Sequence, residues 1–254
     1  MNKKKKLEPI ILRPINWSYV DEKEKVLRAG VEKFKNSSIS LEKIREISDM
    51  QSRRKIPEFQ NRLKILNSDP IMKALIAKHG KLTLERGTDY FESLVRSIIG
   101  QQLSDKAAAT IYKRVLALAG GELSADKIVS TPDEALRQAG LSKNKVNYIK
   151  NLAAAVVDKT IDFVAISKAD DEEVIRQLTA LKGIGRWTAE MFLIFSLARE
   201  DLFSLGDGGL NNAINNLYGK GIALTKDEIK VITDKWQPYR SIASLYLWRS
   251  LDNK

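Results

Sequence analysis

The chain has no cysteine and only one histidine, His79, among its 254 residues. These absences exclude disulfides, thiolate nucleophiles, cysteine-bound zinc, iron-sulfur clusters and any catalytic pair of imidazoles. No run of about 18 apolar residues occurs, and the N-terminal MNKKKKLEPIIL lacks the long apolar stretch of a signal peptide. We therefore expect a soluble intracellular protein whose chemistry, if any, uses carboxylates, hydroxyls, amines or backbone groups.

Positive charge is in excess and unevenly distributed. The 43 Lys and Arg residues against 32 Asp and Glu give a net charge of +11, which favours a polyanionic partner, most often nucleic acid. Residues 1–66 hold 17 of the basic residues and 9 of the acidic ones, and so contribute +8. We interpret residues 1–66 as a basic, mostly helical extension and residues 67–254 as the main domain. The extension is either a solvated helical segment packed on the main domain or an element for DNA contact or nuclear targeting.

Apolar residues recur with a helical period along the chain, as between Leu94 and Leu118, and alternating strand patterns are hard to find. This pattern predicts an all-α fold with roughly ten or more helices joined by short turns. Helix start signals agree with it. Thr131, followed by Pro132 and then Glu134, predicts a threonine N-cap with proline at the first helical position.

Residues 170–199 predict two helices joined by a tight turn. The first helix is expected to end near Leu181, the sequence KGIG follows at 182–185, and the second helix is expected to begin near Arg186. Glycine permits backbone conformations closed to other residues and lets a ligand approach closely. The free N–H groups at the start of the second helix form an anion site that can hold a phosphate without reading sequence. An ordinary helix-turn-helix corner is the alternative.

Four motifs in this chain resemble those of the helix-hairpin-helix DNA glycosylases. LKGIGRWTAE is followed, 22 residues after Gly185, by Asp207, and three more motifs are similar to the 3-methyladenine-DNA glycosylase II branch. These are YFESLVRSIIGQQLSDKAA (90–108), DLFSLGDGGL (201–210) and WQPYRSIASLYLW (236–248). The resemblance covers about residues 67–254. It implies two helical lobes with an active-site cleft between them.

Asp207 is the candidate catalytic residue. In GDGGLNNAI it is also a predicted N-cap of a helix that begins near Gly208, and the two roles are compatible. The resemblance implies that its carboxylate faces the sugar of an extruded nucleotide. A fixed anion there stabilises the positive charge that develops on C1′ and can orient or deprotonate a water molecule. The nearby Asp201 is interpreted as structural or solvent-facing.

The residue two positions after Gly185 separates two mechanisms. Relatives with lyase activity carry a lysine there, and its amine forms a Schiff base with C1′. Trp187 occupies this position here. The resemblance therefore implies a monofunctional enzyme that uses water, requires no cofactor and leaves an intact abasic site.

The resemblance implies that Trp187, Met191 and Trp248 form the base pocket, which suits the need to hold an extruded base between apolar or aromatic side chains. Purines alkylated at N3 or N7 are cationic, and each aromatic face attracts them by roughly 0.5–2 kcal/mol. A core position is the alternative for each tryptophan. Three residues differ from the pattern of the 3-methyladenine-DNA glycosylase II branch. Met191 stands where some relatives have tyrosine, Gly208 where some have an aromatic residue, and Ser204 in place of a usual proline.

The phosphate ligands expected from the resemblance lie around the turn: the amides of Gly183 and Gly185, the hydroxyl of Thr188 and the ammonium of Lys182. The resemblance also implies that a monovalent cation is held there by main-chain carbonyls. These are the carbonyls of Thr179, Leu181 and Ile184. Any residue type supplies a carbonyl, so the sequence itself does not test this inference.

The resemblance implies that Gln102 and Leu103 fill, from the minor groove, the space that the extruded nucleotide leaves, with Gln101 bracing their loop. The alternative is that Leu103 is a core residue and Gln101 a surface amide. Taken together, the motifs predict a monomeric DNA glycosylase of base-excision repair that removes alkylated purines of the 3-methyladenine and 7-methylguanine type from double-stranded DNA. Its expected location is the cytoplasm, with the nucleoid, or the nucleus; it is not expected to be secreted or to bind membranes.

The rival interpretation belongs to a different class: a non-catalytic helix-hairpin-helix protein that recognises damaged or bent duplex. A pure binding module needs neither Asp207 nor the motif at 236–248.

Overall fold

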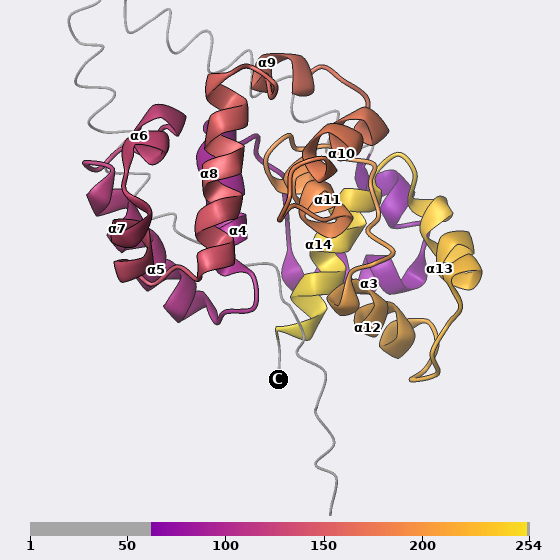
Figure 1. The fold of residues 1–254 in the computed structure, drawn as a ribbon. Helices are drawn as coiled ribbons and strands as arrows, with labels where there is room; N and C mark the ends of the chain where they lie inside the picture. Colours follow the sequence, from indigo (N-terminus) through magenta and orange to yellow (C-terminus); the bar gives the residue numbers. More distant parts are fainter. Residues whose placement is uncertain (1–61, 253–254) are drawn as a thin grey trace, which may run out of the picture.

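The computed structural model describes residues 62–252, which are helical with no strand (Figure 1). This confirms the predicted all-α fold. Residues 1–61, which hold most of the predicted basic extension, lie outside the described residues. Within the described range, no helix combines the length and the apolar character needed to cross a bilayer.

Helical residues 62–66 precede the labelled elements. The helices are α3 (Pro70–His79), α4 (Tyr90–Gly100), α5 (Asp105–Leu118), α6 (Ala125–Ser130), α7 (Asp133–Gln138), α8 (Lys143–Val157), α9 (Phe163–Ile166), α10 (Asp171–Thr179), α11 (Arg186–Phe195), α12 (Gly208–Leu217), α13 (Lys226–Thr233), the 3-10 helix η1 (Asp234–Trp236) and α14 (Arg240–Leu251).

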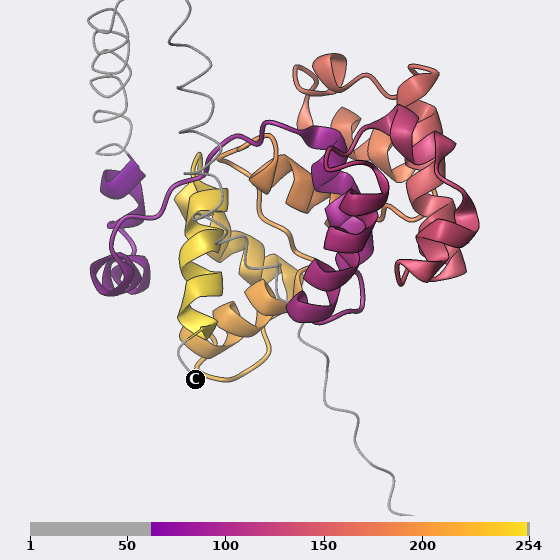
Figure 2. The same ribbon diagram turned by 90° about the vertical axis from the view of Figure 1, so that its left-hand side faces the viewer.

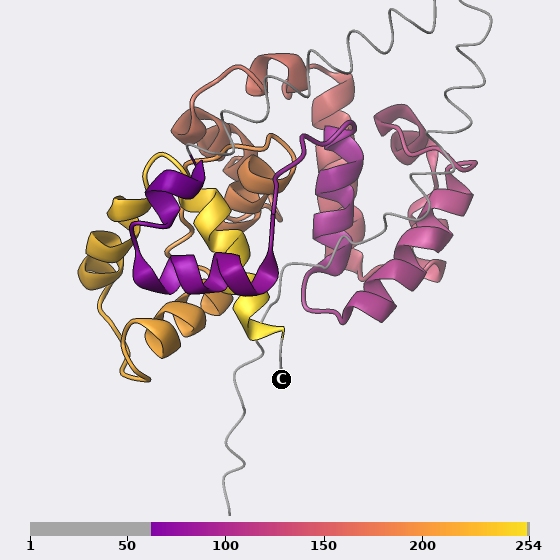
Figure 3. The same ribbon diagram turned by 180° about the vertical axis from the view of Figure 1, so that it is seen from behind.

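The helices form two lobes, each with its own apolar core. Helices α4 to α10 build one core, and α3, α12, α13, η1 and α14 build the other. Figure 1 shows α5 to α8 on one side, α12 and α13 on the other, and α11 and α14 between them. Although α3 precedes α4 in the chain, it packs on the outer side of α14, away from α4 and α5 (Figures 2 and 3). Along the chain, α3 thus belongs to the second lobe, α4 to α10 form the first lobe, and α12 to α14 complete the second.

Helix α11 contributes to both cores. Ala189, Phe192 and Leu193 are buried in the first core, whereas Met191 and Ile194 are buried in the second. The two sets lie on different faces of the helix because residues three or four apart share a face. Side chains on α11 are therefore fixed relative to both lobes.

The segment before α3 packs on the second lobe. Leu66, which the sequence assigns to the extension, is fully buried in the second core. Arg62 forms an ion pair with Glu200, in the loop that leads from α11 to α12. The main domain thus has packing contacts with residues before position 67.

Asp69 fastens α3 to the rest of the second lobe. Its Oδ1 caps α3 by accepting backbone N–H groups of Ile71 and Met72 at 2.9 and 3.2 Å. Its Oδ2 accepts the Tyr218 hydroxyl at 2.8 Å and the Trp236 indole N–H at 2.9 Å. A buried carboxylate with several donors is the arrangement that makes burial of the charge tolerable.

The N-cap prediction at Thr131 is wrong. Thr131 is the C-cap of α6, and its hydroxyl donates to the carbonyl of Lys127 at 2.7 Å. Pro132 is the N-cap of α7, which begins at Asp133 without a side-chain cap. The hydroxyl satisfies a carbonyl at the end of the preceding helix instead of an N–H at the start of the following one.

Candidate active site

The carboxylate of Asp207 lies at the N-terminus of α12 and is only 1% exposed. Asp207 is the N-cap of that helix, and its Oδ1 accepts the Leu210 amide N–H at 2.7 Å. The cap prediction and the helix start at Gly208 are confirmed. The helix dipole adds partial positive charge beside the carboxylate, so a rigid anion is held here by the backbone itself.

Two indole N–H groups also donate to Asp207. Trp187, from α11, donates to Oδ2 at 2.7 Å, and Trp248, from α14, donates to Oδ1 at 3.1 Å. The structure thus brings together three residues that are up to 61 positions apart in the chain. The sequence places both tryptophans in the base pocket but does not predict that they hydrogen-bond the carboxylate.

The surroundings of Trp248 are tightly packed. Its ring lies 5.5 Å from that of Phe195, centroid to centroid. A Cβ added at Gly209 would lie 3.1 Å from the Oδ1 of Asp207 and 3.3 Å from the Cδ1 of Trp248, so the absence of a side chain there lets the two residues meet. Met191 is buried in the same core. Trp248 is therefore a core aromatic as well as a ligand of the carboxylate.

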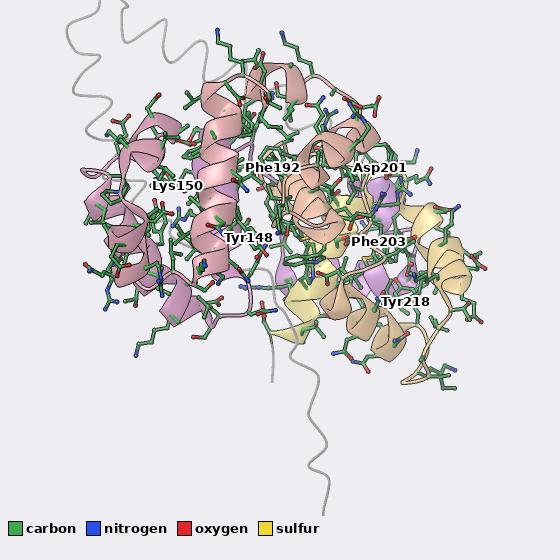
Figure 4. All side chains as sticks on the ribbon, in the orientation of Figure 1. Tyr148, Lys150, Phe192, Asp201, Phe203 and Tyr218 are labelled. Atoms are coloured by element: carbon green, nitrogen blue, oxygen red, sulfur yellow. The ribbon has the colours of Figure 1, made fainter. Side chains whose placement is uncertain are left out.

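The loop that leads to Asp207 is fastened to the start of α14. Arg240 donates from Nε and Nη2 to the two carboxylate oxygens of Asp201 at 2.8 and 3.1 Å. The Ser241 hydroxyl accepts the Leu202 amide N–H at 2.9 Å and donates to the Leu202 carbonyl at 3.1 Å. Asp201, labelled in Figure 4, is structural, as the sequence analysis interprets it.

A buried charged residue that the sequence did not indicate contacts this loop. Glu190 of α11 is 8% exposed, and its Oε1 accepts the Arg186 Nε–H at 3.0 Å. Its Oε2 accepts the hydroxyl of the fully buried Ser204. Ser204 begins a turn closed by a hydrogen bond from the Asp207 amide to the Ser204 carbonyl at 3.1 Å. The only local signal was an acidic residue within an apolar helix.

The hairpin between α10 and α11 forms as predicted, with α11 beginning at Arg186. Gly183 has a φ of 100°, and a Cβ there would lie 2.2 Å from Cγ of Tyr148. Figure 4 shows Tyr148 on α8, on the side toward the hairpin. Gly185 is the N-cap of α11, supplies no side-chain cap, and has nothing within 4 Å of an added Cβ. The first N–H groups of α11 are therefore without a side-chain cap, as an anion site requires.

The other candidate phosphate ligands differ in exposure. Lys182 is exposed beside the turn, whereas Thr188, in the first turn of α11, is buried. The carbonyl of Leu181, one of the three assigned to a cation, accepts the Ile184 amide N–H at 3.1 Å and keeps a second lone pair. Within residues 62–252 no cluster of three or more His, Asp or Glu side chains could hold a metal. The monovalent cation stays a prediction.

The loop after α4 presents Gln102 and Leu103 on the surface. Leu103 is 37% exposed, so the core alternative for it is wrong, and Gln102 has a left-handed φ of 57°. Gln101 donates its side-chain amide to the Gly183 carbonyl at 2.9 Å, which joins this loop to the hairpin. Lys145 of α8 donates to the Gln101 carbonyl at 2.6 Å, and burial lowers the pKa of its ammonium. The predicted wedge and the predicted phosphate site are thus physically connected.

Residues 95–238, more than half of the chain, match a family described as HhH-GPD superfamily base excision DNA repair protein. This chain belongs to that superfamily. In the helix-hairpin-helix that names it, α10 and α11 are the two helices and residues 182–185 are the turn. Asp207 follows the loop between α11 and α12, within the matched residues.

Members of the superfamily are similar to this chain over most of its length. A Schizosaccharomyces pombe protein named alkylbase DNA glycosidase-like protein mag2 is 33% identical over 182 residues, which are 69% of this chain and 85% of that protein. A Bacillus halodurans DNA-3-methyladenine glycosidase structure has a TM-score of 0.69 and 42% identity, covering 75% of this chain and 88% of that one. The S. pombe 3-methyladenine DNA glycosylase Mag1, solved in complex with abasic DNA, has a TM-score of 0.68 and 29% identity, covering 76% and 97%. The predicted helix-hairpin-helix glycosylase fold is confirmed.

Proposed function

We propose that this protein is a monofunctional DNA glycosylase of base-excision repair that hydrolyses the N-glycosidic bond of extruded alkylated purines and leaves an abasic site. The observation that carries the proposal is the buried Asp207 carboxylate, held by the indole N–H groups of Trp187 and Trp248. Relatives named as 3-methyladenine-DNA glycosylases support the reaction and the substrate class.

The proposed chemistry follows from the fixed position of this charge. As the bond between base and sugar breaks, positive charge develops on C1′ and on the ring oxygen of the sugar. Asp207 already lies in place, so it stabilises that charge without reorganising during the reaction. It also orients the water molecule that adds to C1′ and accepts the proton that this water loses. Alkylated purines leave as neutral bases, and the reaction therefore needs no cofactor and no strong general acid.

Double-stranded DNA is the proposed partner. The amides at the start of α11, Lys182 and the Thr188 hydroxyl hold phosphate, while Gln102 and Leu103 fill the gap in the duplex. The partly buried Trp187 holds the extruded base, and Met191 and Trp248 support it from the second core. The proposed active form is a monomer, because every residue assigned to the site comes from one chain.

A non-catalytic DNA-binding protein is the weaker hypothesis. Burial of a carboxylate costs several kcal/mol in lost hydration. The hydrogen bonds to its partners offset a free energy of about that size, so a buried carboxylate adds little net stability. A protein that only grips backbone phosphate gains nothing from an anion beside its hairpin, because the anion repels phosphate. Asp207 is therefore better explained by a reaction that develops positive charge.

Base release without strand cleavage is the first prediction. Incubation of a duplex that contains one 7-methylguanine should release the free base, and the strand should break only after heat or alkali. The reason is that Trp187 stands where a lyase carries its amine. Denaturing gels with and without alkali measure this, and a chelator such as EDTA should leave the rate unchanged. Nicking before alkali treatment would contradict the monofunctional assignment.

The wedge residues supply the second prediction. Replacement of Gln102 and Leu103 by alanine should slow base release from a fully paired duplex about 10-fold, because the extruded state loses what fills the gap. The same variant should be affected less when the damaged base is mispaired, since an unpaired base costs less to extrude. Single-turnover rates on the two duplexes make the comparison. Equal effects on both would mean that these side chains only bind the backbone.

A further inference from the structure

Glu190 is a buried charged residue outside the roles assigned above. It lies on α11 three positions after Trp187, and residues three apart share a helix face. Trp187 donates to Asp207, the last residue of the turn 204–207, and Glu190 accepts the hydroxyl of Ser204, the first. The second helix of the hairpin thus holds both ends of the turn that carries the carboxylate.

The other oxygen of Glu190 connects to the start of α11. Arg186, the first residue of the helix, donates to Glu190 at 3.0 Å and to Glu172 of α10 at 2.6 Å. Arg186 is largely exposed, whereas Glu190 and Ser204 are buried. The path Arg186–Glu190–Ser204 therefore runs from the surface of the hairpin to the catalytic turn through one side-chain hydrogen bond at each step.

We propose that Glu190 is a positioning residue that fixes the catalytic turn to the phosphate-binding hairpin, so that DNA held at the hairpin finds Asp207 at the correct place. This rests on the proposed function. The alternative is an ordinary buried ion pair that only stabilises the fold. The two differ in one respect: a positioning residue affects base release out of proportion to stability, because displacement of a catalytic group by about 1 Å can cost on the order of 100-fold in rate.

The chain offers a matched pair of variants. Ser204→Ala removes one hydroxyl that donates to the buried carboxylate of Glu190, and Tyr218→Phe removes one hydroxyl that donates to the buried carboxylate of Asp69 at 2.8 Å. The second carboxylate caps α3, and its donors Ile71, Met72, Tyr218 and Trp236 lie outside the turn 204–207, although the Trp236 ring is 6.2 Å from that of Phe203. Both changes should destabilise the protein, since each leaves a buried oxygen short of a donor.

The experiment measures three quantities for the full chain and both variants: single-turnover release of 7-methylguanine, affinity for undamaged duplex, and hydrogen exchange at the amides of Asp207 and Leu210. We expect Ser204→Ala to lower base release about 10-fold or more, to leave affinity within 2-fold, and to speed exchange at both amides. Tyr218→Phe should lower thermal stability with base release unchanged. Glu190→Gln, which can still hydrogen-bond Ser204, should retain more activity than Glu190→Leu.

Equal base-release rates for Ser204→Ala and Tyr218→Phe would overturn the positioning role. Unchanged exchange at Asp207 and Leu210 in Ser204→Ala would overturn it too, whatever the activity. If the wild-type protein released no base, the proposed function would fail by itself. The exchange measurement would then still decide whether Glu190 holds the turn.

Discussion

Asp207→Asn should lower the single-turnover rate of base release by about 100-fold or more, the scale seen when a preorganised electrostatic group is removed from an active site. The charge that stabilises the sugar cation is lost. The amide NH₂ of asparagine would also face an indole N–H, because the carboxylate accepts from both tryptophans. We therefore expect a loss in the free energy of unfolding of about 1–3 kcal/mol in addition.

Asp69→Asn is the matched control for this variant. Asp69 also caps a helix and accepts an indole N–H, from Trp236, together with a tyrosine hydroxyl. It should lose a similar amount of stability and keep the wild-type rate of base release at a temperature where both variants are folded. If Asp207→Asn and Asp69→Asn lost activity equally, lower stability would explain both losses. That result would contradict a catalytic role for Asp207.

Gly183→Ala should damage both the fold and DNA binding. A side chain at a φ of 100° costs about 1–3 kcal/mol in backbone strain alone, and the new Cβ would lie 2.2 Å from the Tyr148 ring. We expect the free energy of unfolding to fall by at least about 2 kcal/mol. The affinity for undamaged duplex should fall about 10-fold or more, since the turn must move away from α8 and carries the phosphate site with it.

Substitutions at two other glycines distinguish a loss of stability from a loss of DNA binding. Gly185→Ala places its Cβ in open space at an ordinary φ, so stability should stay within about 0.5 kcal/mol of wild type. Gly219→Ala brings its Cβ to 2.3 Å from the Ile222 carbonyl oxygen, in the second lobe, and should lose stability while keeping DNA affinity. Normal binding by Gly183→Ala would show that the geometry of this turn is not what grips DNA.

Local sequence patterns predicted what depends on near neighbours. The cap at Asp207 and the start of α11 at Arg186 follow from glycines and polar residues within a few positions. Thr131 shows the limit of such signals. Its hydroxyl lies between the last carbonyls of α6 and the first N–H groups of α7, and it bonds a carbonyl of α6. The family resemblance singled out Trp187 and Trp248 as base-pocket residues, which stays a prediction, and it did not predict their hydrogen bonds to Asp207.

Contacts between distant segments could not be predicted from the sequence. Nothing near Glu190 predicts that its partner is Ser204, 14 positions away, and nothing near Gly183 predicts that a ring of α8 covers it. Such pairs are decided by how the lobes pack around α11. They matter most for the candidate site, since the hydrogen bonds to Asp207 from Trp187 and Trp248 are of the same kind.

The most direct test of the central claim is the release of free base from a duplex with a single 7-methylguanine, measured by chromatography and mass spectrometry under single-turnover conditions. The account predicts free 7-methylguanine from the wild-type protein, with the DNA strand intact until alkali is added. An absence of base release from this duplex and from an equivalent 3-methyladenine-like duplex, by protein that is folded and binds DNA, would contradict it.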